Sequence, residues 1–179
     1  MYYRNCGVPP QCSTESTMRL YHFERTQILR TDLETAWAFF SDPRNLPKIT
    51  PPWLGFSVVS TLPERMHAGM IAKFTVRPLP LTTVTWITEI THVAEPYFFV
   101  DEQRFGPYRF WHHQHHFREM PGGIEMRDHV NYILPFGAAG NLANRFVAQR
   151  LQEIFDFRRD TLERIIWKQV KQEQHYEFA

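Results

Sequence analysis

The sequence is poor in several features that would place a protein in a particular class. It contains only two cysteines among 179 residues, Cys6 and Cys12, so a disulfide framework is excluded and a reducing, cytoplasmic location is expected. Neither cysteine has partner ligands at a recognisable zinc spacing. No apolar run approaches the ~20 residues of a membrane-spanning helix, and no apolar segment follows the first Met as in a secretory signal.

An excess of charge of one sign is also missing. The 20 Lys and Arg residues and 19 Asp and Glu residues give a formal net charge of +1. This balance argues against coating of nucleic acid or of an anionic membrane, although it allows a local patch. The sequence has no Gly-x-Ser-x-Gly, no phosphate-binding glycine loop and no His-Glu-x-x-His. We therefore expect no cofactor, no nucleic-acid partner and no insertion into a membrane.

Aromatic residues, in contrast, are abundant: 15 Phe, 7 Tyr and 5 Trp make up 15% of the chain. They either fill a core or line a pocket, and composition leaves both open. The length and the 43% of hydrophobic residues suit one globular domain. We assign this domain to residues 18–170, after a polar lead over 1–17 that is expected to be disordered and before a tail over 171–179. Met18 is a candidate start, because strand-like sequence follows it.

The first part of the domain predicts a strand and two short helices. Leu20–Leu29 alternates like a strand. Thr31 and Glu34 form a capping box that begins a helix. The apolar face of this helix carries Leu33, Trp37 and Phe40. Residues 42–43, Asp-Pro, begin a second helix, which residues 51–52, Pro-Pro, end.

Six further strands and one long helix complete the pattern. The strands are expected at Gly55–Leu62, Met70–Val76, Leu81–Val93, Tyr97–Phe105, Tyr108–Glu119 and Ile124–Leu134. Their short connections predict an antiparallel meander. The helix is expected from about Ala139 to Lys168, with an apolar stripe that must be buried. Its charged residues, Arg158 among them, are interpreted as a solvated face. The fold class is therefore α+β: a curved seven-stranded sheet packed on a long helix.

Three stretches carry a resemblance to a known family. They are residues 31–46 (TDLETAWAFFSDPRNL), residues 101–111 with His113, His115 and Phe117 beyond, and Asp128, Val130, Tyr132 and residues 135–137 (PFG). Over about residues 18–168 the chain resembles the START-like superfamily, also called SRPBCC or Bet v 1-like. Within it, the motifs are similar to a small bacterial subfamily labelled ligand-binding SRPBCC domain or cell division inhibitor.

The resemblance implies a helix-grip fold, with the long helix packed on the concave face of the sheet. It also implies a hydrophobic cavity between helix and sheet, open at one end. The superfamily includes lipid carriers, hormone receptors, polyketide cyclases and ribosome-associated proteins, so the fold alone does not define the activity.

The unusual chemical feature is the segment 111–117, Trp-His-His-Gln-His-His-Phe. Alternate residues of a strand share a face, so Trp111, His113, His115 and Phe117 lie together and are expected to point inward. The neighbouring strand depends on the hairpin loop. A two-residue loop at Gly122–Gly123 pairs His115 with Val130, a four-residue loop pairs it with Asp128, and a three-residue loop makes His129 the neighbour. The first two place Asp128, Val130 and Tyr132 on the inward face, and Asp101 and Gln103 can join them.

Three interpretations of this cluster are open. The first is a polar floor whose His and Asp side chains hydrogen-bond one another inside the fold. The second is ligand recognition by a few polar groups in an apolar pocket. The third uses His113, His115 and Asp128 for chemistry, either as ligands of iron or zinc or as a His–Asp general base.

We expect a binding module more than an enzyme: one that binds or transports a hydrophobic or amphipathic small molecule, such as a lipid or a polyketide-like compound. Beside the histidine strand and its neighbours, the candidate ligand contacts are Trp86, Phe146 and Arg150, the last suited to a ligand carboxylate. Trp53 is a candidate for the mouth of the pocket. The alternatives are a cyclase, dehydratase or hydrolase, and a protein that acts on ribosomes or division machinery. A homodimer is left open.

Overall fold

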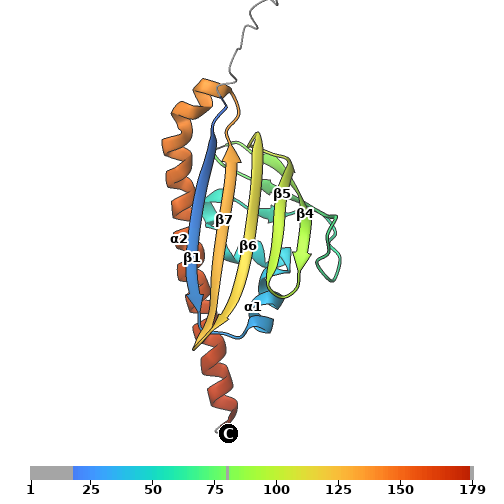
Figure 1. Cartoon of the computed structure of the whole chain (residues 1–179), viewed down its shortest axis with the longest axis vertical. Helices are drawn as coiled ribbons and strands as arrows, with labels where there is room; N and C mark the ends of the chain where they lie inside the picture. Colours follow the sequence, from blue (N-terminus) through green and yellow to red (C-terminus); the bar gives the residue numbers. More distant parts are fainter. Residues whose placement is uncertain (1–17, 80, 178–179) are drawn as a thin grey trace, which may run out of the picture.

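The computed structural model of the chain describes residues 18–79 and 81–177 (Figure 1). The lead expected over 1–17 lies outside these residues. The elements in chain order are β1 (Leu20–Leu29), α1 (Leu33–Phe40), the 3₁₀-helices η1 (Pro43–Ile49) and η2 (Pro52–Leu54), β2 (Ser57–Val58), β3 (Met70–Val76), β4 (Val84–Ala94), β5 (Phe98–Phe105), β6 (Phe110–Met120), β7 (Gly123–Ile133) and α2 (Gly137–Glu177).

The strands form one antiparallel sheet in the order β1-β7-β6-β5-β4-β3-β2. The sheet curves, and α2 runs along it beside β1 (Figure 1). Two irregularities in the β4–β5 pairing, between Ile87 and Thr88 and between Ile90 and His92, add to the bending of this part of the sheet. The predicted α+β helix-grip fold with a seven-stranded sheet is confirmed. No helix of the described residues is long and apolar enough to cross a membrane.

Most element boundaries lie within three residues of the expected ones, and the largest differences are in β2 and at the end of α2. The strand expected over Gly55–Leu62 is reduced to Ser57–Val58, because only these two residues pair with β3. The long helix was expected to end near Lys168, but α2 continues to Glu177. The second short helix, expected from its Asp-Pro start, is a 3₁₀-helix with the Asp42 side chain as its cap.

The cap of α1 is Asp32, so the expected capping box of Thr31 and Glu34 is wrong. One carboxylate oxygen of Asp32 accepts from the backbone N–H of Thr35 and the other from the Thr35 hydroxyl, both at 2.7 Å. These two bonds lower the pKa of Asp32, the backbone N–H of Thr35 contributing most. Because Thr35 supplies both donors, the helix begins one residue later than the box predicts.

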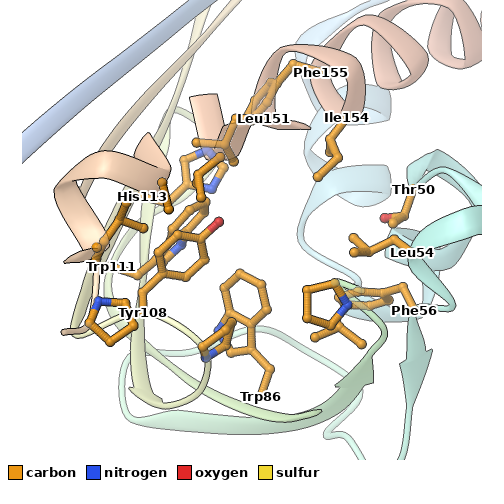
Figure 2. Close-up of a pocket in the computed structure, with 18 of the residues that line it drawn as sticks. Thr50, Leu54, Phe56, Trp86, Tyr108, Trp111, His113, Leu151, Ile154 and Phe155 are labelled. Carbon is orange, nitrogen blue, oxygen red and sulfur yellow. The ribbon is translucent and has the colours of Figure 1, made fainter. Parts of the chain in front are cut away.

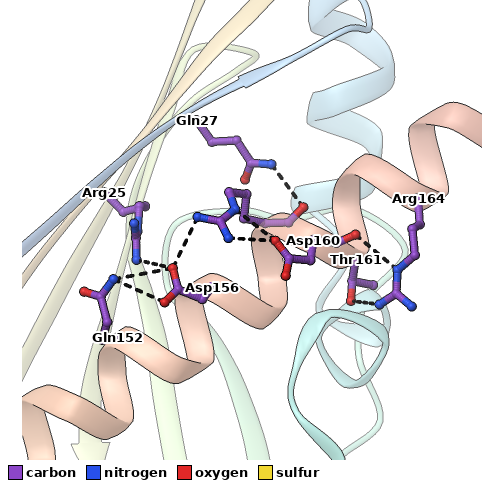
Figure 3. A network of polar contacts seen from close by, with 8 residues as sticks. Arg25, Gln27, Gln152, Asp156, Asp160, Thr161 and Arg164 are labelled. Atoms are coloured by element: carbon purple, nitrogen blue, oxygen red, sulfur yellow. Dashed lines mark hydrogen bonds and ion pairs between the residues drawn. The ribbon is translucent and has the colours of Figure 1, made fainter.

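The outer face of α2 is tied to β1 by polar contacts (Figure 3). Arg25 of β1 donates to Asp156 at 2.7 Å, and Gln27 donates to the carbonyl oxygen of Arg159 at 3.2 Å. Asp156 also pairs with Arg159 one turn along the helix, as expected for a solvated face. The apolar face of α2 therefore has a fixed direction: Leu151, Phe155 and Leu162 are buried against the sheet.

Replacing Asp32 by Ala tests the revised helix start. We expect the free energy of unfolding to fall by about 1 kcal/mol, because two donors of the first turn lose their acceptor. The measurement is urea unfolding followed by circular dichroism. Thr31→Ala is the matched control and should leave the unfolding midpoint almost unchanged. If Thr31→Ala lowered the stability more than Asp32→Ala, the capping box of Thr31 and Glu34 would be the correct helix start.

Candidate ligand-binding site

A cavity of about 450 Å³ lies between α2 and the sheet (Figure 2). The helix contributes Leu151, Ile154 and Phe155. Thr50, Leu54 and Phe56 of the η1–β2 region lie across the space from Tyr108 and Trp111. Strands and loops of the sheet contribute Trp86, Tyr108, Trp111 and His113. Nearly all of this lining is apolar, so the expected hydrophobic cavity between sheet and long helix is confirmed.

The cavity opens where β7 connects to α2. Phe136, in this connection, lines the cavity although 86% of its surface is exposed. Pro78 and Pro107 also line the cavity, from the β3–β4 and β5–β6 connections. Three connections at the same end of the sheet therefore surround the mouth.

A second chamber of about 120 Å³ lies beside the first. Asp101 and His115 are among the residues that line this second chamber, and neither of them lines the first. The side chains that line both chambers are Leu46, Phe56, Trp86, Trp111, His113 and Arg158. The polar end of the cavity is therefore at this shared boundary.

The boundary rests on two carboxylates and two imidazoles from three neighbouring strands. The Oδ1 atom of Asp128 is 2.9 Å from Nε2 of His113 and 3.0 Å from Nδ1 of His115. The Oδ1 atom of Asp101 is 3.3 Å from Nδ1 of His113 and 3.0 Å from Nε2 of His115. Each imidazole thus lies between the same two carboxylates, and the two rings are 3.8 Å apart at their centroids.

The strand register explains this convergence. His113 faces Val130, and His115 faces Asp128, as the longer expected hairpin loop predicts. The loop is nevertheless two residues, Pro121 and Gly122, because Gly123 belongs to β7. A Cβ at Gly123 would lie 2.1 Å from the carbonyl oxygen of Leu29, so the close approach of β1 requires glycine inside the strand.

The charges of the cluster support one another. Burial disfavours both carboxylate ions, but hydrogen bonds and charge from His113 and His115 outweigh it and hold the pKa values of Asp101 and Asp128 below the ordinary 3.8. Burial also disfavours the His113 cation, but Asp101 and Asp128 outweigh it and raise the pKa of His113 above 6.5. Since both ring nitrogens of His113 face carboxylate oxygens, the cationic ring can donate to both.

Arg158 completes the boundary, and its assignment to a solvated face is wrong. Its exposure is 9%, its Nη1 atom is 4.0 Å from Oδ1 of Asp128, and its guanidinium carbon is 4.7 Å from the centre of the Phe155 ring. Burial lowers the pKa of Arg158, and the charges of Asp128 and Asp101 oppose this shift. The sequence held the signal: Arg158 falls at helical spacing on the stripe of Leu151, Phe155 and Leu162.

The other expected contacts divide into lining and supporting residues. Trp86, Trp111 and His113 line the main cavity, and Asp101 and His115 line the smaller chamber. Phe117 packs in the core beside the smaller chamber, Val130 packs in the core beneath Phe155, and Asp128 is buried below the boundary. The Tyr132 hydroxyl donates to Asn144 of α2. Phe117, Val130, Asp128 and Tyr132 therefore support the lining residues but do not line either chamber themselves.

Three expected contacts lie away from both chambers. Gln103 uses its side-chain amide to hold the backbone of Tyr108, at 2.6 Å and 3.3 Å, and so fixes the β5–β6 connection. Phe146 is half-exposed, and Arg150 lies over the rings of Trp53 and Phe146 at 4.7 and 5.1 Å. Arg150 therefore links η2 to α2 on the outside, while sequence reasoning missed Tyr108 and the inward residues of α2.

A metal set can be drawn from the cluster, but with a different carboxylate from the one expected. Ligand atoms of Asp101, His113 and His115 lie within 4.8 Å of one another, and nitrogen and carboxylate ligands suit zinc or iron. Asp128, the expected third ligand, is not in this set; its Oδ1 atom also lies 4.0 Å from Nη1 of Arg158. The distances within the cluster are those of hydrogen bonds, which favours the polar floor; the metal site stays a prediction.

The fold and its cavity make this chain a START-like protein of the SRPBCC type. A profile of the family described as "Polyketide cyclase / dehydrase and lipid transport" matches residues 30–156. The chain therefore belongs to this family, whose description covers both enzymes and carriers. The bacterial subfamily expected from the motifs stays a prediction.

Solved structures share the fold at low identity. The Zhui aromatase/cyclase from Streptomyces sp. R1128 aligns with a TM-score of 0.67 and 10% identity, over 85% of this chain and 96% of that one. The protein TTHA0849 from Thermus thermophilus gives 0.63 and 17%, over 83% and 98%. A nucleoside-diphosphate sugar epimerase from Corynebacterium glutamicum gives 0.61 and 20%, over 79% of this chain and 28% of that one. A search of curated proteins returns no significant match.

The first prediction on the site concerns Asp128. Asp128→Ala should lower the free energy of unfolding by about 3–5 kcal/mol, because it leaves His113, His115 and Arg158 without their shared buried carboxylate. Guanidinium-induced unfolding measures the loss. Asp160→Ala, which removes an exposed carboxylate from α2, should have a far smaller effect. Equal effects of the two changes would mean that the cluster does not hold the fold.

The second concerns pH. The lowered pKa values of Asp101 and Asp128 contribute stability that is present above pH 3.8 and lost as the pH falls below it. The raised pKa of His113 contributes stability that is complete below pH 6.5 and lost as the pH rises through the folded value. The free energy of unfolding contributed by the cluster should therefore be greatest between pH 3.8 and 6.5.

The measurement is urea unfolding of the His116→Gln variant at pH values from below 3.8 to above 6.5. Burial, helped by His129, lowers the pKa of His116, so this residue acts in the opposite direction to His113 below pH 6.5. Removing it leaves the cluster visible. Stability that increases above pH 6.5 in this background would contradict the charge assignment of His113.

Proposed function

We propose that this chain binds and carries a hydrophobic or amphipathic small molecule in the cavity between α2 and the sheet. The observation that carries the proposal is the cavity itself, about 450 Å³ of space with a nearly apolar wall and an open mouth. A volume of a few hundred cubic ångströms with few polar groups is usual for a small-molecule site. The family description, which includes lipid transport, supports the same function.

The lining also favours a planar or branched apolar ligand body over water. Trp86 and Trp111 meet edge to face at 5.3 Å, and Tyr108 packs on Trp111 at 4.8 Å. These rings present flat apolar surface to the cavity and offer water few partners. An apolar ligand body in contact with them is stabilised by the surface that it removes from water.

A cyclase or dehydratase role is the second candidate, supported by the family description. His113 is the one expected catalytic residue that lines both chambers. Its ring nitrogens face Asp128 and Asp101 at 2.9 and 3.3 Å, so neither nitrogen is free to accept a proton from a substrate. This arrangement favours binding over general-base catalysis. Action on ribosomes or division machinery, a homodimer and a cytoplasmic location stay predictions.

Filling the cavity tests the proposal. Val147→Trp places a large ring in the apolar wall, and we expect it to weaken binding of a fluorescent fatty acid such as cis-parinaric acid by about tenfold or more, because the occupied space is lost. Fluorescence titration gives the affinity. Gln149→Trp, on the exposed side of the same helix, is the control and should bind like the wild type. Tight binding by both variants would place the ligand elsewhere.

A further inference from the structure

The boundary between the two chambers holds a buried cation with unused donors. Arg158 is 9% exposed and lines both chambers. Within residues 18–79 and 81–166, whose side chains the structure describes, its Nε atom has no hydrogen-bond partner. Its closest carboxylate contact, Nη1 to Asp128, is 4.0 Å long and therefore is not a hydrogen bond.

The neighbouring carboxylates are already committed. Oδ1 of Asp128 is hydrogen-bonded to Nε2 of His113, and Oδ1 of Asp101 to Nε2 of His115. Each of these oxygens also lies within 3.3 Å of the other ring's Nδ1, and Oδ2 of Asp101 lies 3.3 Å from the indole N–H of Trp111. A guanidinium carries five N–H donors in a planar fork. Buried donors without acceptors are costly and rare in native proteins. The acceptor that Arg158 lacks has to come from the contents of the cavity.

A second unused donor lies at the same boundary. The indole Nε1 of Trp86 is buried and has no partner among the described side chains, although Trp86 lines both chambers. Trp111, beside it, differs in that its indole N–H reaches Asp101. Three buried polar atoms at the boundary thus have no hydrogen-bond partner among the described residues: Nε of Arg158, Nε1 of Trp86 and Nδ1 of His115. Nδ1 of His115 already lies 3.0 Å from Oδ1 of Asp128, whereas the atoms of Arg158 and Trp86 are donors with no acceptor nearby, and Arg158 is a cation.

We propose that the ligand is a carboxylic acid, bound as its carboxylate by Arg158 and Trp86, with its apolar body in the larger chamber. The planar fork of a guanidinium matches the two oxygens of a carboxylate. The sequence suggested that Arg150 contacts a ligand carboxylate. In this proposal Arg158, which is buried and lines the cavity, takes that role. This inference rests on the proposed function, because it names the chemical class of the molecule that the cavity holds.

The experiment compares acids with alcohols of the same skeleton. Isothermal titration calorimetry measures the affinity for dodecanoic acid against 1-dodecanol, and for anthraquinone-2-carboxylic acid against 2-(hydroxymethyl)anthraquinone. In at least one pair the wild type should bind the acid about tenfold or more tightly, as expected for hydrogen bonds to a charged group. Arg158→Met should abolish this preference and keep the affinity for the alcohol.

Controls separate the binding role from a structural one. Arg145→Met removes an exposed arginine of the same helix and should keep the acid preference. Trp86→Phe keeps the ring but removes the donor, and it should reduce the preference in part. This variant and the wild-type ratio carry the test if Arg158→Met does not fold.

The outcomes distinguish the inference from the function beneath it. Equal affinity of the wild type for acid and alcohol, or a preference that survives in Arg158→Met, would overturn the inference and leave the proposed function standing. Failure of all four compounds to bind would overturn the proposed function as well.

Discussion

The fold of this protein depends on a buried cluster of polar and charged side chains, and removing any one of them would leave others without one of their partners. Asp101, His113, His115 and Asp128 come from β5, β6 and β7 and meet on the inner face of the sheet. Taking the carboxylates of Asp101 and Asp128 from water is expensive, and the mutual contacts of the cluster offset the cost only while the set is complete. The three central strands must therefore keep their register, and a helix must cover the cluster.

The helix that covers the cluster cannot be wholly apolar. Leu151, Phe155 and Leu162 of α2 pack on the sheet, and Arg158 takes the position between them that faces the carboxylates. This one arginine changes the chemistry of the interior. It adds a cation to a pair of carboxylates that the imidazoles already satisfy, so the boundary gains donors without gaining acceptors.

The aromatic residues keep the space beside this boundary open. Trp86, Tyr108 and Trp111 contact one another at centroid distances between 4.8 and 5.7 Å. Three mutually packed rings form a stiff wall, because moving one would break its contacts with the other two. Phe117, by contrast, fills the core on the other side of the histidines with Trp37, next to Phe99, which also lines the smaller chamber. The same residue class thus fills one half of the interior and lines the other.

Much of this could be predicted from local patterns, and the exceptions have physical causes. The alternation over 111–117 placed His113 and His115 inward, because strand faces follow a strict period of two. The hairpin loop and the cap of α1 each lie one residue away from the predicted position. The loop position depends on the close approach of Gly123 to the backbone of Leu29 in β1, and the cap depends on the bond from the backbone N–H of Thr35 to Asp32. Arg158 was assigned to the solvated face because charged residues are mostly exposed. This rule fails here because a buried carboxylate, Asp128, lies near the guanidinium and offsets part of the cost of burying it. The cavity was expected from the family resemblance alone. Composition and periodicity left it open, because a cavity depends on the small difference between the volume that the fold encloses and the volume of its side chains.

An unfilled interior lacks the dispersion contacts that a native core would have. A ligand that occupies the space restores them, and its binding stabilises the folded state in proportion to the logarithm of its concentration relative to its dissociation constant. In this protein the unfilled part of the core and the unused donors of Arg158 lie in the same cavity. One amphipathic molecule can therefore supply both, its apolar body to the aromatic wall and its charged end to the boundary.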